Sequence, residues 1–108
     1  MRKAEVRMHD IPAGILTEDD HGYTFTYLPL YLSTPEFPAI SLTLPKTDVP
    51  YTSNVLFPFF DGLIPEGWLL DIAQKNWKIN LHDRMGLLMV CCLDCIGAVS
   101  IENLENEN

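Results

Sequence analysis

The first half of the chain alternates apolar and polar residues at every second position. This period is typical of strands that bury one face. The pattern predicts four strands, over Glu5–His9, Ile15–Thr17, Tyr23–Leu28 and Ile40–Leu44. Because short turns join these segments, we expect an antiparallel sheet.

Turn-forming residues separate the predicted strands. Asp10–Gly14 and Asp19–Gly22 are predicted turns, and Ser33–Pro38 is a predicted loop. Leu30–Leu32 is expected to continue the third strand beyond Pro29, as an edge strand or a bulge would allow.

The hydrophobic period changes from two residues to the helical value after residue 50. Three helices are predicted there: from a cap at Ser53 or Asn54 to about Leu63, over Glu66–Lys78, and over Asp83–Val90. Pro65 directly precedes the second helix, which suits a helix start. A last strand is predicted over Ile96–Ile101.

These elements predict an α+β domain, with a small antiparallel sheet and a cluster of about three helices. A chain of 108 residues fits a single domain, and 47% hydrophobic residues can supply its core. We assign the domain to residues 1–101 and an acidic C-terminal tail to residues 102–108.

The charge balance argues against direct nucleic acid binding. Seven lysines and arginines stand against fifteen acids, for a net charge of −8, whereas phosphate binding needs a basic surface. The negative charge either keeps the chain soluble and away from DNA, or attracts a basic protein partner.

The sequence predicts a cytoplasmic protein that does not enter a membrane. No apolar run follows Met1–Glu5, so we expect no signal peptide. No apolar stretch approaches the roughly 20 residues that a membrane helix needs. The three cysteines, an odd number, suit a reducing compartment.

Candidate catalytic and metal-binding residues are few. Cys92 and Cys95 form a Cys-x-x-Cys motif beside Cys91, but a structural zinc site needs four ligands and only His82 lies near. Structural thiols are therefore favoured over metal or redox chemistry. The histidines are isolated and no phosphate-binding loop is present. We expect no catalytic residues, no metal, no cofactor and no enzymatic activity.

The segment Leu56–Leu70 contains the strongest candidate for partner binding. At about 100° per residue, the apolar face of the predicted helix centres about 140° away from Trp68. Trp68 is either covered by another segment as part of the core or exposed as an interface anchor. The candidate partner-binding residues share this helix and its start: Pro65, Glu66, Gly67, Trp68, Asp71 and Lys75.

Five blocks of sequence, in order, carry a family resemblance. They occupy residues 13–18 (AGILTE), 23–27 (YTFTY), 39–45 (AISLTLP), 63–67 (LIPEG) and 94–99 (DCIGAV). In this series the chain resembles the N-terminal subdomain of HipA-type serine/threonine kinases, which are toxins of bacterial toxin–antitoxin systems. The similarity covers residues 13–101 and implies the fold of that subdomain.

The chain ends where a HipA kinase would continue into its catalytic part, so it resembles HipS, the stand-alone subunit of HipBST systems. That resemblance implies an antitoxin that restrains a HipT-like kinase toxin, in a ternary complex with a HipB-like DNA-binding protein. The alternative is a structural subunit that completes or assembles the kinase–HipB complex without inhibiting the kinase.

Overall fold

A computed structural model of the protein describes residues 2–75, 80–91 and 98–104. Within the helix at residues 66–75, it describes the backbone alone at positions 68, 70 and 72–74.

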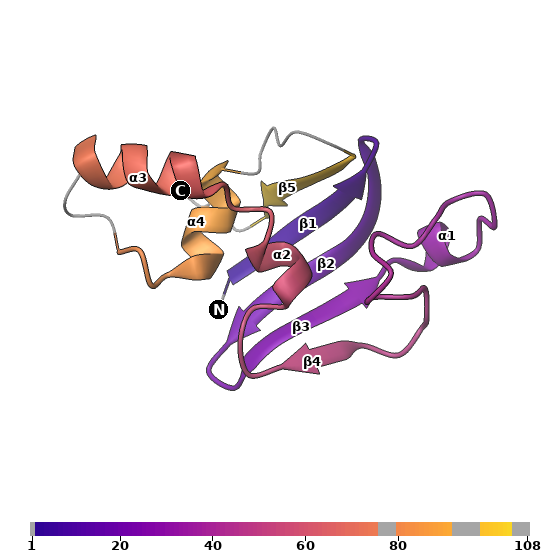
Figure 1. Ribbon diagram of the computed structural model, residues 1–108. Coiled ribbons are helices and arrows are strands. Elements are labelled where there is room, and N and C mark those ends of the chain that lie inside the picture. Colours follow the sequence, from indigo (N-terminus) through magenta and orange to yellow (C-terminus); the bar gives the residue numbers. More distant parts are fainter. Residues whose placement is uncertain (1, 76–79, 92–97, 105–108) are drawn as a thin grey trace.

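The centre of the fold is a five-stranded sheet in which every neighbouring pair is antiparallel (Figure 1). Its strands are β1 (Arg2–Met8), β2 (Ile11–Asp19), β3 (Gly22–Tyr27), β4 (Tyr51–Ser53) and β5 (Val99–Asn103). Their order across the sheet is β4-β3-β2-β1-β5, so β4 and β5 form the two edges.

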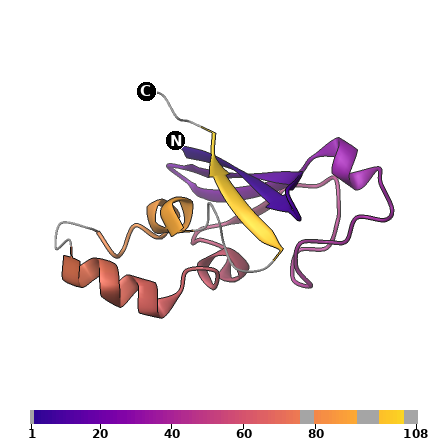
Figure 2. The same ribbon diagram turned by 90° about the horizontal axis from the view of Figure 1, so that it is seen from above.

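The helices lie on one face and at one end of this sheet. They are α1 (Pro29–Leu32), α2 (Pro58–Asp61), α3 (Glu66–Lys75) and α4 (Arg84–Cys91). Seen from above, α2, α3 and α4 lie on the same side, whereas α1 lies at one end of the sheet (Figure 2). The predicted α+β class, with an antiparallel sheet and about three covering helices, is confirmed.

The other face of the sheet is polar. Side chains on β1 alternate, so that Ala4 and Val6 are buried under the helices while Lys3 and Glu5 point outward. No helix of the described residues covers this outer face (Figure 2). A face of this kind can remain in water without a partner.

The first predicted turn is wrong beyond Asp10. The reversal takes only His9 and Asp10, whose φ angles of 51° and 67° form a tight hairpin turn, and β2 resumes at Ile11. The prediction failed here because Pro12, which is typical of a turn, lies inside β2. Pro12 is tolerated because the pairing of β2 with β3 begins only at Gly14, so no neighbour on that side needs its N–H.

Two predictions near β3 are wrong. Leu30–Leu32 forms the one-turn helix α1 instead of extending β3, because Pro29 suits the first position of a helix. Ile40–Leu44 is a tight turn rather than a strand, with the Leu44 N–H bonded to the Ser41 carbonyl at 3.1 Å. The Tyr27 hydroxyl holds the two sides together: it accepts the Ile40 N–H at 3.1 Å and donates to the Leu44 carbonyl.

The helical half agrees better with its prediction. The first predicted helix is wrong at its start, because β4 occupies Tyr51–Ser53 and α2 begins only at Pro58. The second begins at Glu66 as predicted, although residues 76–78 lie outside the described residues. The third, α4, agrees within one residue and buries Leu87 and Leu88.

The last predicted strand is shifted towards the C-terminus. It spans Val99–Asn103, and positions 96 and 97 lie outside the described residues. Glu102 and Asn103 therefore belong to β5 and not to an acidic tail. The Leu104 N–H also bonds to the Lys3 carbonyl at 3.0 Å, beside the start of β1.

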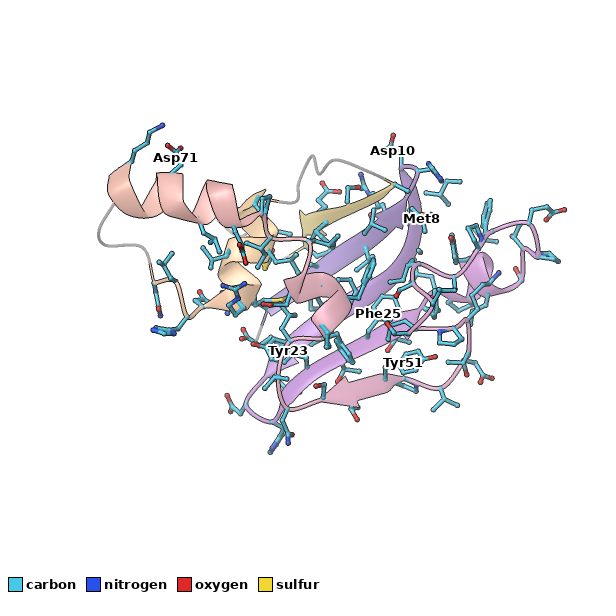
Figure 3. The ribbon with its side chains drawn as sticks, in the orientation of Figure 1. Met8, Asp10, Tyr23, Phe25, Tyr51 and Asp71 are labelled. Atoms are coloured by element: carbon cyan, nitrogen blue, oxygen red, sulfur yellow. The ribbon has the colours of Figure 1, made fainter. Side chains whose placement is uncertain are left out.

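The core is organised around the ring of Phe25, which points from β3 towards α2 (Figure 3). It lies directly against Gly14 on β2, where an added Cβ would come within 2.6 Å of two ring atoms. Ring contacts continue in both directions as an aromatic row: Phe60, Phe25, Tyr27, Tyr31 and Phe37. The centroid separations in this row range from 4.9 Å, for Phe25–Tyr27, to 6.1 Å, for Tyr27–Tyr31.

A shared arginine links the sheet to the last helix. Arg2 on β1 donates to Glu18 on β2 and to Asp83, each at 2.6 Å. Asp83 also accepts the Gly86 N–H at 3.2 Å, so its carboxylate caps α4 while pairing with Arg2. The hydrogen bond from Arg2 is the main reason why the pKa of Asp83 is lowered from its ordinary value.

Replacing Gly14 by Ala should lower the free energy of unfolding by about 1–3 kcal/mol, because Phe25 and the Thr26 carbonyl leave no room for a methyl group. Gly67→Ala is the matched control. It adds a methyl group on α3 with nothing within 4 Å, and should stabilise by about 0.4–1 kcal/mol. Urea unfolding of both variants measures the difference. Equal changes in the free energy of unfolding would show that Phe25 does not restrict the residue at position 14.

The Arg2–Asp83 pair should make stability depend on acid pH. Because the folded pKa of Asp83 is lowered, its contribution is fully present above the unfolded pKa of about 3.9 and is lost as the pH falls through the folded pKa. Asp83→Asn removes the charge. The parent should therefore be more stable than this variant at pH 7, and the gap should close below about pH 4. A gap in urea midpoint that stays constant from pH 7 to about 2.5 would contradict the pairing.

Candidate functional site

The candidate site lies at the corner between α2 and α3. Phe60 is fully buried and anchors α2 in the core. The chain then turns through two hydrogen bonds, from the Leu63 N–H to the Phe60 carbonyl at 3.0 Å and from the Ile64 N–H to the Asp61 carbonyl at 3.2 Å. Ile64 is buried as well, so both sides of the turn are fixed to the core.

Pro65 starts the next helix directly after this turn. Its carbonyl accepts the Leu69 N–H at 3.1 Å, which is the first bond of α3. Glu66 lies in the first turn, where a negative charge suits the positive end of the helix. The corner is therefore a series of hydrogen-bonded turns rather than a loose linker.

An ion pair links the corner to α4. Arg84 on α4 donates to the Asp61 carboxylate at the end of α2, at 2.6 Å. Because Asp83, the residue before Arg84, pairs with Arg2 on β1, two neighbouring residues connect the corner and the sheet to the start of α4. This arrangement holds the end of α2, from which the chain turns into α3.

Helix α3 presents an exposed outer face. Gly67, Asp71 and Lys75 recur every fourth residue, and all three are exposed. Asp71 and Lys75 form an ion pair at 3.1 Å with side chains 58% and 75% exposed, and such a pair contributes little to stability. Figure 3 shows Asp71 directed away from the body of the molecule. Leu69, in contrast, is half-buried against the core and marks the inner face.

Position 68 is the third residue of α3. At about 100° per residue, its backbone position lies about 20° around the helix from Lys75 and about 60° from Asp71. The side chain of Trp68 lies outside the described part of the structure, so its role as anchor or as core residue stays a prediction. Trp77 also lies outside the described residues.

The structure brings the predicted partner-binding residues together on one helix and its start. Pro65, Glu66 and Gly67 are exposed at the corner, and Asp71 and Lys75 continue the exposed face along α3. Their contact with a partner stays a prediction. They do form a continuous accessible surface on a fixed support.

The other candidate residues are not gathered into a site. His9, His21 and His82 are exposed in separate parts of the fold. Among the described residues, no group of three or more His, Cys, Asp or Glu side chains is arranged to hold a metal ion. Cys91 is half-buried at the end of α4, and Cys92 and Cys95 lie outside the described residues.

Two surface features escaped the sequence analysis. A polar cleft of about 400 Å³ lies between the tip of the β2–β3 hairpin and β4, with Tyr23 and Thr52 in its walls. It was missed because β4 was not predicted, and its last residue, Ser53, was instead a candidate helix cap. The second feature is Leu42, whose exposed fraction of 98% contradicts the buried strand position that the alternation predicted.

No helix in the described ranges combines the length and the apolar character that a membrane span requires.

Comparisons with known proteins identify the family. Residues 4–102 match the family model of the HipA N-terminal domain. An uncharacterized protein of Haemophilus influenzae is 33% identical over 102 residues, which cover 94% of this chain and 92% of that protein. A solved structure described as the N-terminal domain of HipA toxin matches with a TM-score of 0.79 and 29% identity, over 99% of this chain and 96% of that one.

These matches confirm the resemblance that the five sequence blocks carried, and the fold that it implied. The matched region is the N-terminal, non-catalytic domain of HipA, which makes this chain a HipA-related toxin–antitoxin component. The chain belongs to the HipA N-terminal domain family.

Proposed function

We propose that this chain is an antitoxin of the HipS kind, which binds a HipT-like serine/threonine kinase and inhibits it. The observation that carries the proposal is the start of α3. A HipA N-terminal domain here exposes a helix face directly after a corner that is fixed to both the core and α4. A kinase that lacks this domain would offer the complementary surface.

Inhibition at such a surface needs no chemistry from this chain. Phosphoryl transfer depends almost entirely on the positions of ATP, the metal ions and the glycine-rich loop. A bulky side chain inserted near that loop would disturb those positions. In this proposal Trp68 is the inserted residue, and Pro65–Gly67 forms the corner that supports it.

The hydrogen bonds of the corner favour this role. Binding costs less free energy when the contact residues are already held in their bound arrangement. The bonds from Leu63 and Ile64, together with the ion pair of Asp61, limit how far the start of α3 can move. Asp71 and Lys75 would then contact the kinase beside the inserted residue, since they lie on the adjacent turns of the outer face.

The size of one relative supports a separate subunit. The alignment covers 92% of the Haemophilus influenzae protein, so that protein is about as long as this one domain. Under this proposal the chain is not an enzyme, acts in the cytoplasm with its kinase, and joins a ternary complex with a HipB-like DNA-binding protein. The net charge of −8 favours contact with these proteins over contact with DNA itself.

A non-inhibitory structural subunit is the second candidate. The family match favours a structural role, because the same domain is an integral part of HipA. The two functions predict opposite effects on the purified kinase. An antitoxin lowers the rate of phosphoryl transfer, whereas a completing subunit raises it or leaves it unchanged.

Trp68→Ala should abolish protection against growth arrest when the variant is expressed with the kinase, and should restore phosphoryl transfer in vitro. A buried aromatic anchor typically contributes 2 kcal/mol or more to binding, so we expect the inhibition constant to rise by about 30-fold or more. Trp68→Phe should retain part of the inhibition because it keeps an aromatic ring.

Val90→Ala is the control, because Val90 is 67% exposed on α4 and has no proposed role. It should inhibit like the parent. Thermal unfolding of each variant separates lost binding from lost folding. A folded Trp68→Ala variant that inhibits as strongly as the parent would disprove the role of Trp68.

A further inference from the structure

The turn at residues 41–44 exposes the hydrophobic side chain of Leu42, which takes no part in the core. Ile40 and Leu44 on either side are buried, at 5% and 4% exposure, while Leu42 between them is 98% exposed. A leucine at such a position gains little from folding, because the hydrophobic effect rewards only the area removed from water. Contact with another molecule would bury it.

The turn is held rigidly by its own hydrogen bonds. The Ser41 carbonyl accepts the Leu44 N–H at 3.1 Å, and the Ser41 hydroxyl accepts the Thr43 N–H at 3.2 Å. The Ser41 and Thr43 hydroxyls also lie 2.9 Å apart. Leu42 therefore lies at the tip of a closed turn, and a partner would not have to order the backbone on binding.

The turn is also fixed to the rest of the fold. Tyr27 contacts both of its sides through one buried hydroxyl, as described above. Tyr31 donates to the Pro38 carbonyl at 2.6 Å, and the Lys46 ammonium donates to the carbonyls of Thr34 and Phe37 at 3.0 and 2.8 Å. Leu42 is thus presented on a surface as well supported as the α2–α3 corner.

Leu30 adds a second exposed leucine at this end of the molecule. It lies on α1 and is 78% exposed. Both views show α1 and α3 at opposite ends of the sheet (Figures 1 and 2). A protein that binds the outer face of α3 would leave Leu30 available to a second partner.

The charges of the loop indicate the chemistry of that partner. Between α1 and β4, the charged residues are Glu36, Lys46 and Asp48. Lys46 is occupied by two carbonyls and lies over the Tyr31 ring at 5.3 Å, whereas Glu36 and Asp48 are exposed. The exposed charges of this loop are therefore negative, and they complement a basic protein surface.

We propose that the Leu42 turn, together with Leu30, is a second protein-docking surface, which inserts Leu42 into an apolar pocket bordered by lysine or arginine on a basic protein. This inference rests on the proposed function only in its choice of probe. The DNA-binding subunit of the same toxin–antitoxin system is that probe, because a protein that binds phosphates carries a basic surface.

The test measures the affinity of the full chain for the purified DNA-binding subunit, alone and with the kinase present. Leu42→Asp should weaken this binding at least about tenfold, as expected for an interface anchor, while inhibition of the kinase stays unchanged. Raising the salt concentration should weaken binding of the parent chain as well. Because Leu42 is almost fully exposed, the melting temperature of Leu42→Asp should equal that of the parent. Leu42→Ser is a second variant, without an added charge.

Val90→Asp is the matched control, with the same added charge at an exposed position on α4, and should bind like the parent. The proposal is overturned if the parent chain does not bind the DNA-binding subunit under either condition, or if Leu42→Asp binds it normally. It is also overturned if Leu42→Asp loses only its effect on the kinase. None of these results depends on Trp68, so failure here is distinguishable from failure of the inhibitory role.

Discussion

The contact of Phe25 with Gly14 is the constraint on which the rest of the fold depends. The ring occupies the space in which any other residue at position 14 would place its Cβ, so only glycine leaves room for the ring there. From this point the aromatic row extends to Phe60 on α2 in one direction and to Phe37 in the other. The same row therefore supports the α2–α3 corner and the loop that carries Leu42.

This arrangement explains how a small domain could support the two proposed contact surfaces. At one end, Phe60 and the Asp61–Arg84 ion pair hold the end of α2, from which the chain turns into α3. At the other, the Tyr27 hydroxyl closes the turn around Leu42. Both surfaces are supported by buried aromatic residues and by hydrogen bonds to the main chain. A docking subunit benefits from such supports, because little conformational entropy is lost on binding.

The sequence predicted the class of the fold and the start of α3, because two-residue alternation and a proline before a helix are local signals. The prediction from sequence failed where residues far apart in the sequence determine the local structure. The turn at residues 41–44 depends on the hydroxyl of Tyr27, which the local alternation does not reveal. Pro12 and Gly14 read as turn residues, yet both lie in β2, since β3 pairs only beyond Pro12 and Phe25 needs Gly14. The candidate site was found as a set of residues, while its support by Asp61 and Arg84 was not.

The central functional claim is that the kinase binds at the start of α3. Hydrogen exchange of the chain, with and without an excess of the kinase, tests it most directly because it reports on each segment separately. We expect slower exchange of the amides in Glu66–Lys75 in the complex, and unchanged exchange in the turn at residues 41–44. Unchanged exchange in α3, with new protection confined to the outer face of the sheet or to the Leu42 turn, would contradict the claim.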